Sequence, residues 1–184
     1  MPTGTERLDL LISERRIRAR VAALARRIDA DYRGRNLNLV VVLKGAFVFA
    51  ADLARQIGIP FTIDFVSAAS YGAGTRSSGT ITLGGLDRLE IAARDVLVVE
   101  DILDTGRTST AILDALRQRG AASPGSLALC TLLRKPAAAA LDLPARYVGF
   151  DIAHDFVVGY GMDHAERHRN LRGIHRLILD ARCG

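Results

Sequence analysis

Four short runs rich in apolar residues, alternating with segments of helical period, constrain the fold most strongly. The runs are LNLVVVL (37–43), FTIDFV (61–66), VLVV (96–99) and SLALCTLL (126–133). Each run predicts a strand, and the continuous apolar run SLALCTLL is the pattern expected of a strand buried on both faces of a sheet. Buried strands that alternate with helices predict an α/β fold with a mainly parallel sheet flanked by helices. In such sheets ligands bind beyond the carboxyl ends of the strands, so we expect the functional residues directly after these runs.

Helical periodicity fills the intervals between the runs. From Ser13 to about Asp31, apolar residues recur at spacings of four, three and four, which predicts an amphipathic helix capped by Ser13. AFVFAADLARQIG (46–58) also has helical period. SYGAGTRSSGT (70–80) is dense in Gly, Ser and Thr, which predicts a mobile loop. Past Pro144 the chain holds short apolar pieces broken by Gly, His and charge, which indicates a small lobe packed over the sheet.

Length and composition predict a single cytoplasmic domain. The 184 residues, 49% of them hydrophobic, suffice for a sizeable core. No apolar run approaches the roughly 18 residues of a membrane span, and the segment MPTGTERLDLLISERR lacks the apolar stretch of a signal peptide. Two cysteines are too few to indicate a disulfide framework or a zinc site.

The segment EDILDTGRT (100–108) carries the most informative chemistry. It follows the run VLVV and opens a helix, whose unpaired N–H groups and dipole favour an anion. Gly106 lets the backbone approach a phosphate closely, and the flanking threonines add hydroxyl donors. Glu100 and Asp101 suit ribose hydroxyls or a hard cation such as Mg²⁺. The segment predicts a site for a sugar phosphate with a metal, and an acidic helix N-cap is the alternative.

The longer segment VVEDILDTGRT (98–108) resembles the phosphoribosyl pyrophosphate signature of the type I phosphoribosyltransferases. The chain is similar to the hypoxanthine-guanine branch in particular through four further segments, namely LKGAFVFAADL (43–53), DFVSAASYG (64–72), LLRKP (132–136) and VGFDIAHDFVVGYGMD (148–163). The similarity covers about residues 10 to 180. It implies the type I phosphoribosyltransferase fold, with a core at about 10–145 and a small hood lobe formed mainly by the N-terminal segment and about 146–184.

The resemblance also implies a reaction and an assembly. Members of this branch use Mg²⁺ and transfer the 5-phosphoribosyl group of phosphoribosyl pyrophosphate to N9 of hypoxanthine and/or guanine. The products are IMP or GMP and pyrophosphate. Relatives associate as dimers and tetramers, so we expect a homodimer or homotetramer, with no membrane partner.

Site residues for the phosphoribosyl group follow from the same resemblance. In the family, the acids matching Glu100 and Asp101 contact the ribose hydroxyls and organise the metal. The 5-phosphate is implied to bind the next loop, formed by Asp104, Thr105, Gly106, Arg107 and Thr108. Asp104 also matches the candidate general base facing purine N7, where a carboxylate is suited to carry the proton. A loop-capping role is the alternative for Asp104.

Further positions match the pyrophosphate site and the lid of the family. Lys44-Gly45 matches a pair that faces the pyrophosphate, often through a strained or cis peptide bond, although taken alone the pair indicates only a turn. Arg169 matches an arginine that reaches the pyrophosphate, and its guanidinium fork suits paired oxygens. Ser70 and Tyr71 resemble the start of a closing lid, which would exclude water during the reaction.

The purine site is implied by a third group of positions. Lys135 matches the lysine that donates to the 6-oxygen, and a donor-only ammonium favours an oxo group over the amino group of adenine. Phe156 matches the aromatic that stacks on the base, with core packing as the alternative, and Val157 matches backbone contacts to the base edge. Asp163 matches a ligand of the metal bound to pyrophosphate, which completes a metal set with Glu100 and Asp101.

Other functions stay open at this point. The net charge of +5 and the pI near 9.8 permit an RNA-binding regulatory protein of the same fold. Against it, the arginines are spread along the chain and aromatic residues make up only 5%. A transferase for xanthine or a pyrimidine is a further alternative.

Overall fold

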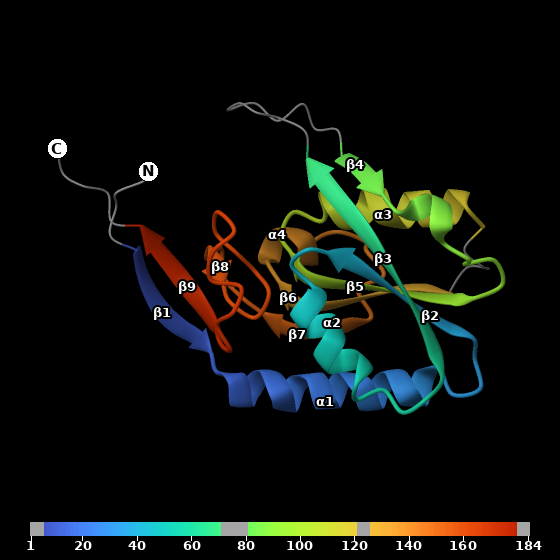
Figure 1. Ribbon diagram of the computed structural model, residues 1–184, viewed down its shortest axis with the longest axis horizontal. Coiled ribbons are helices and arrows are strands. Elements are labelled where there is room, and N and C mark those ends of the chain that lie inside the picture. The colour runs from blue at the N-terminus through green and yellow to red at the C-terminus, as the bar shows by residue number, and fades with distance from the viewer. Residues whose placement is uncertain (1–5, 71–80, 121–125, 180–184) are drawn as a thin grey trace.

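The computed structural model describes residues 6–70, 81–120 and 126–179, and its centre is a six-stranded sheet (Figure 1). The strands lie in the order β4-β3-β2-β5-β6-β7. Their bounds are β2 (Leu37–Leu43), β3 (Phe61–Ser70), β4 (Ile81–Gly84), β5 (Asp95–Leu103), β6 (Leu127–Arg134) and β7 (Tyr147–Asp151). Neighbouring strands are parallel except β3 and β4, which are antiparallel. The predicted α/β fold with a mainly parallel sheet is therefore confirmed.

Helices cover both faces of this sheet. α1 (Glu14–Asp31) and α2 (Phe47–Ala54) pack on one face, and α3 (Arg107–Gln118) packs on the other. In Figure 1, α1 runs along the bottom of the molecule and α3 lies near the top. Successive side chains of β2 point into two hydrophobic cores, one on each face of the sheet. Leu39 lies in the core under α1 and α2, and Val40 lies in the core under α3. A strand covered on both faces must be apolar throughout, which explains the continuous run.

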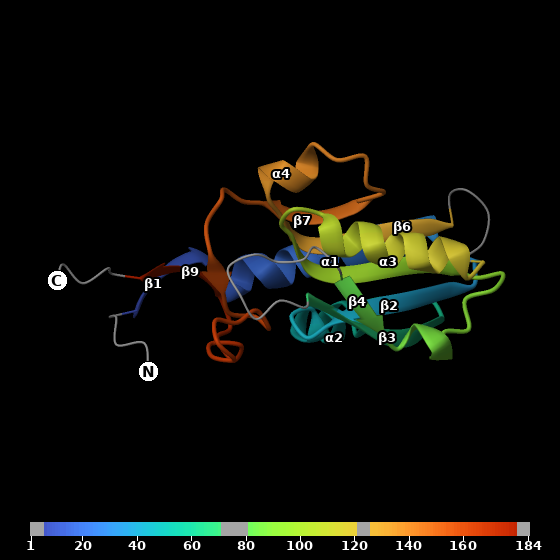
Figure 2. The same ribbon diagram turned by 90° about the horizontal axis from the view of Figure 1, so that it is seen from above.

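A second, antiparallel sheet joins segments that are far apart in the chain. Its strands are β1 (Glu6–Ile12), β9 (Ile174–Leu179) and β8 (Val157–Val158), in the order β1-β9-β8. Figures 1 and 2 both show β1 and β9 standing apart from the main sheet, beyond one end of it. Two short elements complete the described fold, the 3-10 helix η1 (Leu86–Arg88) and α4 (Pro136–Ala139).

Three element boundaries differ from those expected. β5 extends through Leu103 because it stays paired with β6, so Glu100 and Asp101 lie within a strand rather than in a turn. β7 adds a parallel strand beside β6, although the sequence pattern past Pro144 indicated a small lobe packed over the sheet. α2 ends at Ala54, short of the expected helix end at residue 58.

The loop expected at 70–80 falls almost entirely outside the described residues. Ser70 ends β3, and residues 71–80, which include Tyr71, are not described. Across the described part of the chain, no helix combines the length and the apolar character that a membrane crossing requires.

The strand order defines where a ligand crevice should lie. From β2 the chain passes outward to β3 and then returns to β5 on the other side of β2. Sheets of this kind bind ligands where the order reverses, outside the carboxyl ends of the strands. Lys44 follows β2 at this reversal, and Asp104 follows β5.

Candidate functional site

A cleft of about 290 Å³ lies at the reversal, between the carboxyl ends of the strands and the segment that follows β7. Its lining residues are Lys44, Gly45, Asp101, Ile102, Asp104, Lys135, Phe156, Val157, Met162, Asp163 and Arg169. All of these except Ile102 and Met162 are residues that the sequence singled out. The two exceptions are apolar side chains inside segments that the sequence analysis did single out, EDILDTGRT and VGFDIAHDFVVGYGMD, but an apolar side chain has no polar group to mark it as a site residue.

The turn after β2 is packed tightly against β5. The Leu43–Lys44 peptide bond is cis, one residue before the Lys44–Gly45 bond to which the resemblance pointed. A Cβ atom at Gly45 would lie 1.9 Å from Oδ2 of Asp101, so a larger residue there would have to displace the Asp101 carboxylate. Gly161, with φ +100°, packs against the same turn from the other side. A Cβ atom at Gly161 would lie 2.4 Å from the carbonyl oxygen of Gly45.

The adjacent acids of β5 face opposite sides of the sheet, as neighbours on a strand must. Glu100 is 4% exposed and accepts a hydrogen bond from Ser109 of α3, so it does not line the cleft. Burial raises the pKa of Glu100 to about 8, against the lowering effect of the Ser109 hydroxyl. Asp101 faces the cleft, where burial of its carboxyl raises the pKa to about 6. Arg169 opposes that rise and Asp163 adds to it.

Asp104 and Lys135 meet across the cleft floor. The Lys135 ammonium donates to Oδ2 of Asp104 at 2.8 Å, and the Lys135 residue is 8% exposed whereas the Asp104 side chain is 55% exposed. The backbone holds the pair together, because the N–H of Lys135 donates to the carbonyl of Leu103. A buried ammonium requires such a partner, since an unpaired buried charge is strongly unfavourable.

The predicted phosphate loop lies at the start of α3. Asp104, Thr105 and Gly106 precede the helix, and Arg107 and Thr108 are its first residues. Gly106 has φ +73° at the N-cap position, and a Cβ there would lie 2.5 Å from Cδ1 of Leu141. The loop therefore places a helix N-terminus beside Asp104, which is the arrangement that suits an anion.

The opposite wall comes from the segment between β8 and β9 and its neighbours. Phe156 is 52% exposed, and its ring lies nearly perpendicular to the His164 ring, with 5.5 Å between the ring centroids. Val157 begins β8 beside it. Asp163 accepts from Arg169 at 2.8 Å through Oδ1. These contacts place an aromatic face, a carboxylate and a guanidinium on one side of the cleft.

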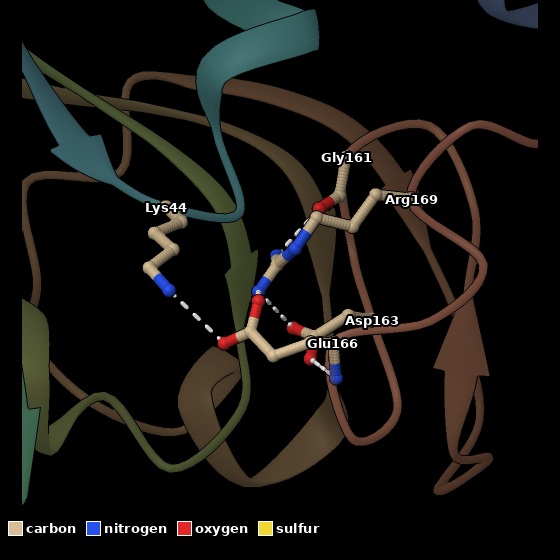
Figure 3. A network of polar contacts seen from close by, with 5 residues as sticks. All are labelled: Lys44, Gly161, Asp163, Glu166 and Arg169. Carbon is tan, nitrogen blue, oxygen red and sulfur yellow. Dashed lines mark hydrogen bonds and ion pairs between the residues drawn. The ribbon is translucent and has the colours of Figure 1, made fainter.

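Sequence reasoning missed Glu166, which stands at the edge of the cleft. Figure 3 shows its carboxylate between Lys44 and Arg169, at 3.0 Å from each cation. The ion pair and hydrogen bond with Lys44, followed by those with Arg169, lower the pKa of Glu166. A single glutamate in the charged stretch HAERHR looks like an ordinary surface residue, so no local signal could have found it.

Glu6 of β1 is a second missed residue. Its carboxylate lies 2.9 Å from Nε2 of His168 and 3.5 Å from Nδ1 of His164, and it also contacts Arg167. The hydrogen bond with His168 is the main cause that lowers the pKa of Glu6. Glu6 thereby ties the N-terminal strand to the loop that carries Asp163 and Arg169.

Not every predicted site residue reaches the cleft. Glu100 faces α3, Ser70 lies at the end of β3 with its side chain undescribed, and Tyr71 lies outside the described residues. Four residues at the start of α3 also lie outside the cleft lining, next to Asp104, namely Thr105, Gly106, Arg107 and Thr108. Within the described ranges, no three His, Cys, Asp or Glu side chains converge into a ready-made metal site. Asp101 and Asp163 are the carboxylates that face the cleft beside Arg169.

Comparisons with known proteins agree with this geometry. The family model described as "Phosphoribosyl transferase domain" matches residues 11–165. The hypoxanthine phosphoribosyltransferase of Salmonella typhimurium is 42% identical over 175 residues, covering 94% of this chain and 96% of the relative. The hypoxanthine-guanine phosphoribosyltransferase of Mycobacterium avium is 47% identical over 175 residues, covering 91% of this chain and 84% of the relative. A crystal structure of a Bacillus anthracis hypoxanthine-guanine phosphoribosyltransferase is 44% identical, with a TM-score of 0.83 over 92% of this chain and 98% of that one.

Proposed function

The chain belongs to the phosphoribosyl transferase family, and on this premise we propose that it transfers the 5-phosphoribosyl group of phosphoribosyl pyrophosphate to N9 of hypoxanthine and/or guanine. The products are IMP or GMP and pyrophosphate, a purine salvage reaction. Relatives that match nearly the whole chain are named for this reaction. The observation that carries the proposal within this molecule is the Asp104–Lys135 pair in the cleft.

This pair fits two adjacent atoms of a 6-oxopurine. The 6-oxygen is an acceptor, N7 carries a proton in one tautomer of the free base, and the two atoms are neighbours on one edge. Lys135 offers only donors and suits the oxygen, while the Asp104 carboxylate accepts the proton from N7. As N9 forms its bond to the anomeric carbon, the bond to pyrophosphate breaks and the N7 proton passes to Asp104. The exposed ring of Phe156 supports a stacking role against the base, and Val157 supports contacts to the base edge.

The phosphoribosyl group is proposed to bind along the end of β5 and the start of α3. The helix N-terminus formed by Thr105, Gly106, Arg107 and Thr108 suits the 5-phosphate. Asp101 faces the cleft and suits the ribose hydroxyls. Glu100 takes the same role only if its carboxylate turns from Ser109 toward the cleft.

Magnesium is proposed as the metal. Two cleft carboxylates, Asp101 and Asp163, match the usual Mg²⁺ environment of one or two protein carboxylates completed by substrate oxygens and water. Glu100 remains the third candidate, from the resemblance. When bound, the ion would supply positive charge that stabilises the departing pyrophosphate.

The pyrophosphate itself is proposed to meet Lys44, the backbone of Gly45 and Arg169, which line the same part of the cleft. Its negative charge matches the ammonium and the guanidinium. Ser70 and Tyr71 keep the proposed role of a lid, which rests on the sequence alone. We also propose that the chain forms one cytoplasmic domain, with the core expected at about 10–145 extended through β7 and a hood from the remaining segments.

A homodimer or homotetramer is proposed for the assembly. Phe47 of α2 and two side chains of β3, Ile63 and Phe65, are large hydrophobic residues left at least 39% exposed. Exposed apolar surface of this kind is typical of interfaces. Light scattering on the purified protein measures the mass directly, and a monomer at micromolar concentration would overturn the proposed assembly.

A spectrophotometric assay tests the reaction. Purified protein is mixed with phosphoribosyl pyrophosphate, Mg²⁺ and, in separate cuvettes, hypoxanthine, guanine, xanthine, adenine and uracil, with a parallel series in EDTA. We expect turnover of hypoxanthine, guanine or both, and none in EDTA. Turnover of xanthine or uracil alone would change the proposed substrate. No turnover with any base would overturn the enzymatic proposal and support the RNA-binding alternative, which the comparisons do not favour.

A further inference from the structure

The two cations assigned to pyrophosphate are already bridged by a carboxylate of this chain. Glu166 Oε1 lies 3.0 Å from Nζ of Lys44, and Glu166 Oε2 lies 3.0 Å from Nη2 of Arg169 (Figure 3). Lys44 follows β2 on the core side, whereas Glu166 and Arg169 belong to the segment between β8 and β9. The carboxylate therefore links the two walls of the cleft where a substrate anion would bind.

Arg169 already contacts three acceptors of its own chain in this arrangement, two of them through Nη2. Its Nη1 donates to the carbonyl of Gly161 at 2.8 Å, and its Nη2 meets Asp163 at 2.8 Å as well as Glu166. A pyrophosphate oxygen can bind Nη2 only if Asp163 or Glu166 withdraws, because an Nη nitrogen carries two hydrogens. The exposed fractions identify which one, because the Glu166 side chain is 67% exposed and the Asp163 side chain only 28%.

The backbone also makes Glu166 the partner that can leave. Its N–H donates to Oδ2 of Asp163 at 2.9 Å, which anchors the main chain while leaving the carboxylate on the solvent side. Neither Lys44 nor Glu166 is buried, with side chains 70% and 67% exposed, so breaking this ion pair exposes no new apolar surface. Exposed ion pairs are individually weak, which makes the exchange of one anion for another feasible.

Resting on the proposed function, we propose that Glu166 is an internal counter-ion of the pyrophosphate subsite. In the unliganded protein it holds Lys44 and Arg169 together across the cleft. The pyrophosphate group displaces it on binding, and Glu166 reclaims both cations as pyrophosphate departs. Glu166 thereby lowers the affinity for the pyrophosphate group and speeds its release.

Physical reasoning fixes the sign of the effect. Bound pyrophosphate must replace two ion pairs that Glu166 makes with its charged carboxylate, so neutralising that carboxylate removes the competitor. Glutamine keeps the size of the side chain but loses the charge that holds both cations. If Glu166 instead bound the metal or oriented Arg169 for the ligand, its neutralisation would weaken binding.

Calorimetric titration of inorganic pyrophosphate in Mg²⁺ tests the proposal without relying on turnover. We expect Glu166→Gln to bind pyrophosphate about three- to tenfold more tightly than the wild type, the range that two weak exposed pairs supply. Asp114→Asn is the matched control, because it also removes one exposed carboxylate paired with an arginine, on α3 far along the chain. The control should bind like the wild type. Equal or weaker binding by Glu166→Gln would overturn the proposal.

A charge-conserving variant separates bridging from simple repulsion. Aspartate at position 166 keeps the negative charge, but its shorter side chain cannot reach both cations, so we expect Glu166→Asp to bind pyrophosphate more tightly than the wild type as well. Wild-type affinity in Glu166→Asp would overturn the bridging role. No binding of pyrophosphate by any of the proteins would remove the subsite and overturn the proposed function itself, a result distinct from equal binding by all of them.

Ionic strength provides an independent readout. Salt screens exposed charges, so the advantage of Glu166→Gln over the wild type should shrink between low salt and about 1 M salt, where the screening length falls to about 3 Å. If Glu166→Gln still bound pyrophosphate more tightly than the wild type by the same factor at high salt, a mechanism based on exposed ion pairs would be contradicted.

Discussion

At the scale of single residues, the cleft combines groups whose ordinary properties are changed by their surroundings. The Lys135 ammonium is nearly buried and depends on Asp104 for a partner. Glu100 is buried beside Ser109, and this burial raises its pKa to about 8. These two sites lead to three predictions that differ in what is measured.

Asp104→Asn should lower kcat by about a hundredfold to ten-thousandfold, the usual contribution of a positioned general base. Asparagine still offers an acceptor to Lys135, so the binding of phosphoribosyl pyrophosphate should change little. Steady-state kinetics and a separate binding titration distinguish the two effects. Turnover equal to that of the wild type would exclude Asp104 as the base.

Lys135→Ala should narrow the preference for 6-oxopurines over adenine. Loss of a charged hydrogen bond to the 6-oxygen lowers kcat/KM for hypoxanthine by about ten- to a hundredfold, whereas adenine has no oxygen there to lose. The ratio of kcat/KM for hypoxanthine and adenine is the measurement. An unchanged ratio would show that selectivity arises elsewhere.

Glu100→Gln should flatten the pH dependence of stability in the unliganded protein. The folded state keeps the Glu100 proton up to a pKa of about 8, above the ordinary value of 4.5, so between these values the folded state binds more protons than the unfolded state. Stability must then fall as pH rises through this window, and glutamine cannot ionise. Melting temperatures in EDTA from about pH 5 to pH 9 should decline more steeply for the wild type; parallel curves for the two proteins would contradict the buried, protonated state.

At the scale of secondary-structure elements, the site depends on where neighbouring strands end and on the contact between β1 and the loop before β9. β2 and β5 end side by side, and their following turns carry Lys44 and Asp104 into one cleft. β1 contributes nothing to the cleft lining, yet its first residue, Glu6, contacts the segment that carries Asp163 and Arg169.

Glu6→Gln should raise the KM for phosphoribosyl pyrophosphate several-fold while changing kcat much less. Glu6 touches no substrate atom in the proposed reaction and acts by positioning the loop through His168 and Arg167. Asp9→Asn is the control, since Asp9 lies on the same strand and pairs only locally, with Arg7 at 3.1 Å. Equal KM values for both variants would refute the positioning role.

At the scale of the whole molecule, the second sheet and its loops must seat closely on the main sheet for the cleft to exist. Gly161 and Gly45 make this seating possible, because a Cβ at Gly161 would lie 2.4 Å from the carbonyl oxygen of Gly45. Arg169 donates to the carbonyl of Gly161 and so fixes the position of this glycine within its own segment.

Gly161→Ala should destabilise the protein by about 1–3 kcal/mol and lower activity, since the added methyl group overpacks the contact and φ is +100° there. Gly34→Ala is the matched control: Gly34 also has positive φ, +75°, but a Cβ there meets nothing within 4 Å. Urea unfolding of both variants separates the steric effect from the conformational one. A loss of stability no greater in Gly161→Ala than in Gly34→Ala would mean that the contact between Gly161 and Gly45 can shift to accept the methyl group.

Much of the site could be predicted because its residues lie in motifs of consecutive residues. A buried strand precedes each of DTGRT, Lys44-Gly45 and Lys135, and the ends of neighbouring parallel strands meet in space. The segment that carries Phe156, Asp163 and Arg169 came from resemblance to known enzymes, since its short strands and turns have no marked periodicity.

The sequence by itself determined the alternation of buried strands and helices, and with it the mainly parallel sheet, because burial on both faces imposes a local apolar pattern. Only the tertiary structure decided that Glu100 and Asp101 face opposite sides, because the continued pairing of β5 with β6 sets where that strand ends. It also decided that Glu166 bridges Lys44 and Arg169 and that Glu6 meets His168, 162 residues away. Such contacts join residues that are ordinary in their own segments, so only the packing of distant segments brings them together.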